Sequence, residues 1–130
     1  NFNIVIETLA NELKVKELLK KNYGSLSAGQ KTKVNLCKAL LNQPKLLLLD
    51  EPTASLDPET SIFIRNYLLE YQKKTNSSIL ITSHNLNEVQ TMCSNIILLK
   101  SGEIVSQGNI KKVLKKYNYK TLIELFLSEG

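Results

Sequence analysis

Apolar residues recur three and four positions apart along much of the chain, and this spacing predicts amphipathic helices. The predicted helices cover residues 9–21, 27–42, 58–74, 85–93 and 110–117. Residues that can cap a helix stand at three of the predicted starts: Ser27 with Gln30, Asp57 before Pro58, and Asn85 with Glu88.

Two apolar runs without helical spacing, at residues 46–49 and 78–82, predict β-strands. The first consists of four leucines, which is typical of a parallel strand covered on both faces. Two further strands, at 96–100 and 103–107, flank a Ser-Gly dipeptide that favours a tight hairpin turn. The order helix, strand, helix, strand, helix, hairpin, helix predicts an α/β fold with a parallel sheet.

The composition fits a globular protein rather than a membrane span. The 130 residues are 42% hydrophobic and 22% charged, and no apolar run approaches the roughly 20 residues that cross a bilayer. The two cysteines, Cys37 and Cys93, lie in helical patterns without CxxC spacing, so we expect reduced core residues.

The net charge is +5, and several of the excess lysines lie between residues 111 and 120. The apolar residues among them fall at helical spacing, at Ile110, Val113, Leu114 and Tyr117. The lysines are therefore predicted to line the solvent face of an amphipathic helix, and no direct nucleic-acid partner is expected.

The leucine strand ends at two adjacent carboxylates, Asp50 and Glu51, which are followed by Pro52. Ligands of parallel sheets gather at the carboxyl ends of the strands. One carboxylate there can hold Mg²⁺ while the other orients or deprotonates a water. The alternative is that these residues only end the strand and begin a turn. The chain contains no G-x-x-x-x-G-K-[ST] phosphate loop to accompany them.

Two other places carry candidate chemistry. His84, the single histidine, closely follows the second strand, although a lone histidine is more often structural. Ser27 and Gln30 have the spacing of a capping box, and Gly29 lets backbone approach a ligand, so this helix start could bind phosphate. An ordinary capped helix explains the same residues.

Together these pieces resemble the ATP-binding subunits of ABC (ATP-binding cassette) transporters. Residues 26–30 (LSAGQ) match the signature motif of that family, 46–51 (LLLLDE) its Walker B strand, 55–57 (SLD) its D-loop, and His84 its switch histidine. The resemblance covers about residues 23–108. It implies part of a P-loop NTPase-type parallel sheet flanked by helices, with a C-terminal β-hairpin and helix.

The resemblance also implies an ATPase that uses ATP and Mg²⁺. Asp50 would support Mg²⁺, Glu51 would act as the general base, and His84 would contact the γ-phosphate.

In this family the signature motif of one subunit closes on ATP held by a second ATP-binding subunit, in a head-to-tail dimer. Ser27, Gly29 and Gln30 would therefore serve the ATP of the partner. Asp57 would link the two sites.

Small departures from the family pattern are Ala28 and Ala54 where glycine is common, and Cys37-Lys38 in the signature helix. The large departure is that the Walker A loop and the glutamine loop are missing, since only 26 residues precede Ser27. We therefore expect a C-terminal portion of such a subunit.

The expected portion would consist of the end of a helical subdomain at 1–22, an ATPase core fragment at 23–108 and a helical tail at 109–130. In the family the Walker A strand lies beside the strand at 78–82. A chain without it is expected to expose apolar surface, to self-associate or be marginally stable, and to be inactive by itself.

The function predicted for the intact protein is ATP hydrolysis that powers membrane transport. The partners would be a second ATP-binding subunit and a transmembrane permease, which would hold the protein on the cytoplasmic face of the membrane. The C-terminal residues 117–127 resemble the tails of exporter-type subunits. Two alternatives stay open: an ATPase of this family without a transport role, and a non-catalytic dimerisation module.

Overall fold

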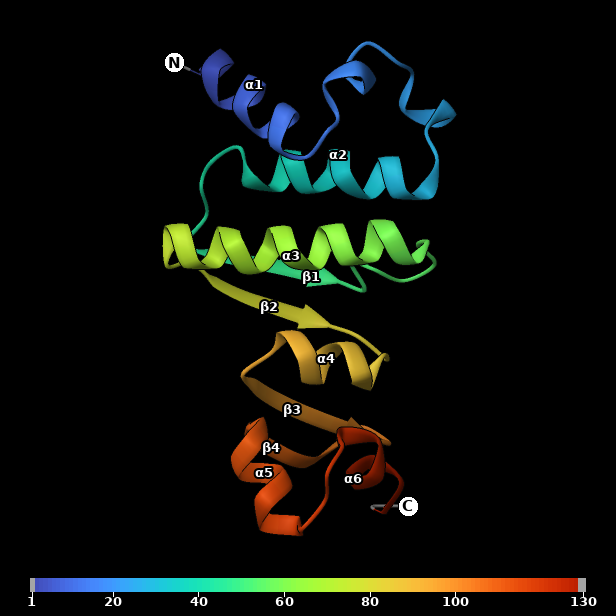
Figure 1. The fold of residues 1–130 in the computed structure, drawn as a ribbon, viewed down its shortest axis with the longest axis vertical. Helices are drawn as coiled ribbons and strands as arrows, with labels where there is room; N and C mark the ends of the chain where they lie inside the picture. The colour runs from blue at the N-terminus through green and yellow to red at the C-terminus, as the bar shows by residue number, and fades with distance from the viewer. Residues whose placement is uncertain (1, 129–130) are drawn as a thin grey trace. The chain divides into compact units, whose positions relative to one another are not determined.

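The computed structural model describes residues 2–128 of the chain. These residues form two compact units, which divide between Thr82 and Ser83. The order of the elements along the chain can be followed in Figure 1.

The first unit contains three helices and two parallel strands. The elements are α1 (Phe2–Glu12), 3-10 turns at Lys16–Leu18 and Tyr23–Ser25, α2 (Ala28–Leu40), β1 (Leu46–Asp50), α3 (Pro58–Thr75) and β2 (Ser78–Thr82). The predicted starts of α2 and α3 and the predicted strands are confirmed, because Ser27 and Asp57 are the N-caps and both strands form.

The prediction of a helix over residues 9–21 is wrong, because α1 begins at Phe2 and ends at Glu12. Lys14 has a φ of 56°, in the left-handed region that ends helices. The N–H of Val15 then donates to the carbonyl of Ala10 at 2.8 Å and closes the last turn. The apolar residues that suggested a longer helix, Leu13 and Val15, are fully buried beyond its end.

The strands β1 and β2 pair in parallel over their whole length, from Leu46 opposite Ser78 to Asp50 opposite Thr82. The prediction that β1 is covered on both faces is wrong. Leu47 is 4% exposed, whereas Leu46 and Leu48 are 56% and 64% exposed. Successive side chains of a strand point to opposite faces. Within residues 2–128, therefore, β1 is well covered on one face only.

The second unit consists of a helix, a hairpin and two further helices. The elements are α4 (Leu86–Met92), β3 (Asn95–Lys100), β4 (Glu103–Asn109), α5 (Ile110–Tyr117) and α6 (Leu122–Ser128). Ser101 and Gly102 both have positive φ, 52° and 82°, as the favoured two-residue hairpin turn requires. The predicted hairpin is thus confirmed.

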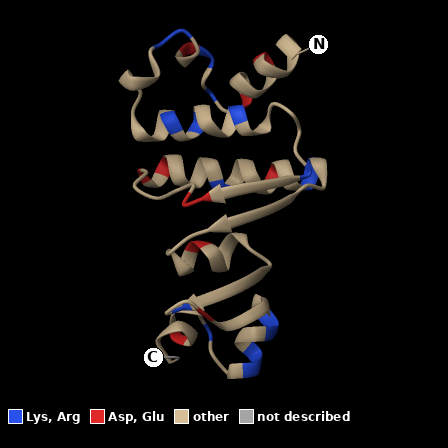
Figure 2. Ribbon diagram, turned by 180° about the vertical axis from the view of Figure 1, so that it is seen from behind, with Lys and Arg blue, Asp and Glu red and all other residues tan. Residues whose placement is uncertain are grey.

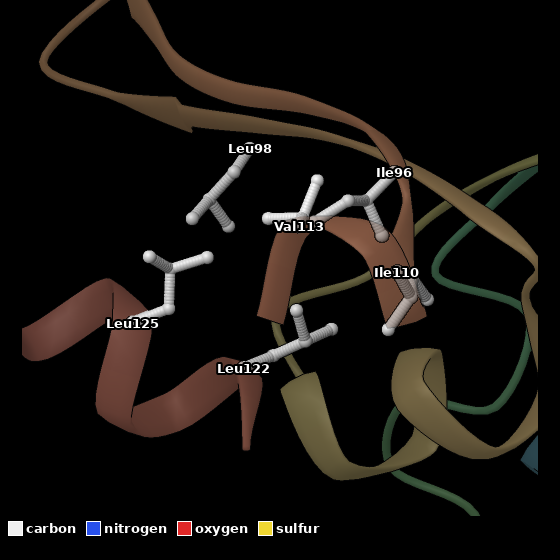
Figure 3. Close-up of a cluster of buried hydrophobic side chains, with 6 residues drawn as sticks. All are labelled: Ile96, Leu98, Ile110, Val113, Leu122 and Leu125. Atoms are coloured by element: carbon white, nitrogen blue, oxygen red, sulfur yellow. The ribbon is translucent and has the colours of Figure 1, made fainter. Parts of the chain in front are cut away.

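The core of the second unit is a cluster of six buried side chains, shown in Figure 3. They come from alternate positions of β3 and from α5 and α6: Ile96, Leu98, Ile110, Val113, Leu122 and Leu125. The lysines of α5 are exposed, as the spacing predicted, and basic residues colour this helix blue in Figure 2.

A glutamine side chain attaches α6 to α4. Gln90 accepts a hydrogen bond from the N–H of Leu122 through Oε1 at 2.8 Å. It also donates from Nε2 to the carbonyl of Lys120 at 3.3 Å. The start of α6 is therefore held by polar contacts as well as by its buried leucines.

Both cysteines are free thiols, Cys37 buried and Cys93 half-buried, as expected of reduced core residues. Burial raises the pKa of each thiol. No helix within residues 2–128 is long and apolar enough to cross a membrane.

The exposed leucines on β1 and β2 generate a prediction. Leu46 and Leu48 of β1 are joined by Leu80 of β2, which is 57% exposed. Contiguous apolar surface of this kind favours association. We expect the 130-residue chain to associate as its concentration rises, and Leu48→Lys to weaken the association. Sedimentation velocity over a concentration series measures this.

Leu127→Lys is the matched control, because Leu127 is an exposed leucine on α6. It should leave the association of the chain unchanged. A monodisperse wild-type monomer that melts cooperatively would contradict the prediction.

Candidate functional site

The two strands of the first unit end side by side, and this places polar groups together. Asp50 of β1 lies opposite Thr82 of β2 in the parallel register. The hydroxyl of Thr82 donates a hydrogen bond to Oδ1 of Asp50. The Asp50 carboxylate and Thr82 are both exposed, so the group is open to a ligand from solution.

Glu51 lies just beyond the end of β1, where the chain turns. Its φ is 46°, in the left-handed region that non-glycine residues seldom adopt. Its N–H donates to the carbonyl of Thr82 at 3.0 Å and contacts the hydroxyl of the same residue at 3.3 Å. The N–H of Ala54 donates back to the carbonyl of Glu51 at 3.1 Å. The backbone of Glu51 is thus fixed by β2 on one side and by the following turn on the other.

The predicted capping box at the start of α2 is confirmed. The N–H of Gln30 donates to Oγ of Ser27 at 3.2 Å, and the N–H of Ser27 donates to Oε1 of Gln30 at 3.0 Å. A helix start carries a partial positive charge, which favours anions. Ser27 and Ala28 are exposed there, so this end of α2 is accessible.

Gly29 packs against the first turn of α3. A Cβ added at Gly29 would lie 3.2 Å from Cγ2 of Thr60, closer than most contacts allow. The N–H of Thr60 donates to Oδ1 of Asp57 at 2.9 Å and completes the cap of α3. The starts of α2 and α3 are therefore close together, and the lack of a side chain at Gly29 leaves room for Thr60.

Hydrogen bonds from the side chain and backbone of Thr60 lower the pKa of Asp57. The carboxylate is fully exposed, so the cap is formed in contact with water. The Asp57 carboxylate therefore stays ionised, and able to cap α3, at pH values that would protonate an ordinary aspartate.

His84 belongs to the second unit, in the short segment before α4. The segment is shaped by Asn85, which donates from its N–H to Oγ of Ser83 at 3.1 Å and caps α4 by accepting from Glu88 at 3.2 Å. His84 is exposed. Along the chain it follows Thr82, the last residue of β2, by two residues.

The predicted site residues thus fall into local groups. Asp50 and Glu51 meet at the end of β1. Ser27, Gly29 and Gln30 form the start of α2, which contacts the start of α3 through Thr60. Roles for these residues remain predictions.

Sequence reasoning missed Thr82 and Thr60. The signal for Thr82 was its position as a polar residue at the end of β2, the strand that pairs with β1, which itself ends at Asp50. The signal for Thr60 was its place three residues after the N-cap Asp57, where a cap receives its hydrogen bond.

The donor set fits Mg²⁺ rather than a metal enclosed by protein ligands. Within residues 2–128 no group of three His, Cys, Asp or Glu side chains could hold a metal ion. Mg²⁺ keeps several waters and takes one or two carboxylates together with phosphate oxygens. Asp50 offers such a carboxylate, because only its Oδ1 receives the Thr82 hydroxyl.

The chain is similar in sequence to ATP-binding proteins of transport systems. A family model described as ABC transporter matches residues 1–54. The methionine import ATP-binding protein of Protochlamydia amoebophila is 38% identical over 106 residues, which are 82% of this chain and 31% of the relative. The tungstate uptake ATP-binding protein of Peptoclostridium acidaminophilum is 40% identical over 96 residues, 74% of this chain and 45% of the relative.

Solved structures show the same likeness. A nucleotide-free ATP-binding cassette from an ABC transporter is 29% identical with a TM-score of 0.76, over 88% of this chain and 46% of that one. A second structure, the ATP-binding subunit of an ABC transporter, shares the fold with a TM-score of 0.85 at 24% identity, over 98% of this chain and 53% of that one.

The fold and the matches define an α/β domain of the ATP-binding cassette class. The chain belongs to the ABC transporter ATP-binding family, as the sequence motifs predicted. It spans less than half the length of the two curated relatives described here.

The cap of α3 gives a prediction for pH. The pKa of Asp57 is lower in the folded chain than its ordinary value, so its contribution to stability is complete above the unfolded pKa of about 3.9. It is lost as the pH falls through the folded pKa. Asp57→Asn keeps a side-chain oxygen that can accept the hydrogen bond from the N–H of Thr60, but the amide group does not titrate. The stability difference between wild type and Asp57→Asn, from urea unfolding at several pH values, should shrink below about pH 4.

Glu59→Gln is the control, because Glu59 is an exposed acid in the same helix turn. A difference between wild type and Asp57→Asn that stays constant down to the lowest pH would contradict the assignment.

Proposed function

We propose that this chain supplies the water-activating and signature parts of an ABC ATPase that hydrolyses ATP to drive membrane transport. The observation that carries the proposal is the Asp50-Glu51 pair, fixed at the carboxyl end of a parallel strand in a member of the ABC family. The relatives named above support it, since both are ATP-binding proteins of uptake or import systems.

Asp50 and Glu51 have different roles at the end of β1. Asp50 would hold Mg²⁺ through its carboxylate, whose Oδ1 receives the Thr82 hydroxyl. Mg²⁺, when bound, neutralises charge on the phosphates of ATP. Glu51 accepts a proton from the water that attacks the γ-phosphate, which contributes about 10²- to 10⁴-fold in rate. The family resemblance assigns His84 a contact with the γ-phosphate.

The start of α2 serves the ATP of a second ATP-binding subunit. The hydroxyl of Ser27 accepts from Gln30, which leaves its own proton for a phosphate oxygen. The N-terminal backbone of α2, at Gly29 and Gln30, adds the positive end of the helix. Asp57, at the start of the helix that packs on Gly29, connects this surface with the turn after Glu51.

The partners in this proposal are a second ATP-binding subunit and a transmembrane permease, with the protein on the cytoplasmic face of the membrane. One of the related structures is described as part of the ABC transporter complex cbiONQ, at 32% identity and a TM-score of 0.72. The names of the two curated relatives reported above specify import or uptake. They do not support the export direction that residues 117–127 suggested, so the proposal covers transport without a direction.

The proposal predicts a phosphate loop in the same protein. A G-x-x-x-x-G-K-[ST] sequence should occur about 90 to 100 residues before Ser27 in the translated reading frame upstream of Asn1. Sequencing the gene tests this directly. A frame without such a loop would reject ATP hydrolysis and favour the non-catalytic dimerisation module.

The second test concerns Glu51, in the protein that contains the phosphate loop. Glu51→Gln should lower the turnover of ATP at least about 100-fold, because the amide cannot accept the proton of the water. Binding of ATP should persist, which a fluorescent ATP analogue measures.

Glu59→Gln is the matched control and should keep normal turnover, since Glu59 lies exposed in α3. Unchanged hydrolysis in Glu51→Gln would remove Glu51 from the role of base. We expect the 130-residue chain by itself to show no measurable hydrolysis, and a magnesium-dependent rate from pure material would contradict this.

A further inference from the structure

We propose that Thr82 is a positioning residue that fixes both members of the acid pair through one hydroxyl group. The hydroxyl donates to Oδ1 of Asp50 and accepts the N–H of Glu51. It therefore joins the side chain of one acid to the backbone of the next. This inference rests on the proposed function and adds to it a residue outside the four motifs that identified the family.

The register of the sheet makes the contact possible. β1 and β2 run in parallel and end at the same level, with Asp50 and Thr82 as the last register pair. A residue one position earlier on β2 would point to the opposite face of the sheet. Threonine is also branched at Cβ, so its χ1 angle is restricted and the direction of the hydroxyl is set by the strand.

The hydroxyl acts on Asp50 by distinguishing its two oxygens. A hydroxyl proton directed at Oδ1 satisfies that oxygen and limits rotation of the carboxylate. Oδ2 is then the oxygen presented to a cation. Without the hydroxyl the carboxylate could rotate freely, because Asp50 is exposed to water.

The hydroxyl acts on Glu51 by supporting an unfavourable backbone conformation. Glu51 has a φ of 46°, and such conformations persist in non-glycine residues when the surroundings hold them. Two oxygens of Thr82 accept its N–H, the carbonyl at 3.0 Å and the hydroxyl at 3.3 Å. Loss of the hydroxyl leaves the Thr82 carbonyl as the acceptor of the Glu51 N–H and removes one support of this conformation.

The competing explanation is that threonine is simply favoured in strands and forms incidental hydrogen bonds at their ends. Valine separates the two explanations. It has the same branching and a similar size, and it favours strands equally, but it has no hydroxyl. Serine keeps the hydroxyl without the branch.

The first experiment follows the backbone amide of Glu51 by hydrogen exchange, using NMR on the 130-residue chain without nucleotide, at a concentration below that at which sedimentation shows association. Thr82→Val should speed exchange at Glu51 about three- to tenfold, the range expected for loss of one exposed hydrogen bond. Thr82→Ser should restore most of the protection. The amide of Leu47, which by the alternation of a parallel ladder faces β2 as the amide of Glu51 does, is the internal control and should keep its rate in both variants.

The second experiment measures ATP turnover in the protein that contains the phosphate loop. Thr82→Val should lower kcat about tenfold while KM for ATP changes less than about twofold, because the defect lies in orienting the base rather than in binding. Thr82→Ser should recover most of the lost kcat. A purely structural defect would lower kcat equally in Thr82→Val and Thr82→Ser.

The outcomes separate this inference from the proposed function. A wild-type protein that hydrolyses no ATP would reject the proposed function, while the exchange rates would still decide whether Thr82 positions the turn. Unchanged exchange in Thr82→Val would overturn the positioning role. So would a normal kcat in Thr82→Val, or a serine variant as slow as the valine variant.

Discussion

The parallel pairing of β1 with β2 is the interaction on which the candidate site depends. It aligns the carboxyl ends of the two strands, so Asp50 and Thr82 meet as the last pair of the register. A slip of one residue would turn Thr82 to the other face and remove the hydroxyl from both acids. The chemistry proposed for Asp50 and Glu51 therefore depends on the backbone hydrogen bonds that pair β1 with β2.

A second constraint is the close approach of two helix starts. Gly29 of α2 lies against Thr60 of α3, and Asp57 holds Thr60 through the cap of α3. The glycine of the signature motif thus has a packing role in addition to the phosphate role that the family resemblance implies. A Cβ at this position would require the Thr60 side chain to shift by a few tenths of an ångström. The start of α2 and the acid pair both lie in the first unit.

The sequence predicted elements well where local chemistry decides them. Caps at Ser27 and Asp57 and the Ser-Gly turn depend on neighbouring residues, and all were visible. It failed where packing decides: Leu13 and Val15 continue a helical spacing but are buried beyond a helix that ends at Glu12. Thr82 escaped notice because its significance comes from a partner 32 positions away in the chain.

The side chain of Gln90 has one more implication for the C-terminal helix. A primary amide offers a donor and an acceptor about 2 Å apart, and here each meets its complement, a carbonyl at Lys120 and an N–H at Leu122. Sliding α6 along by a residue would set these groups against unmatched ones. The two hydrogen bonds of Gln90 therefore fix the register of α6 against α4.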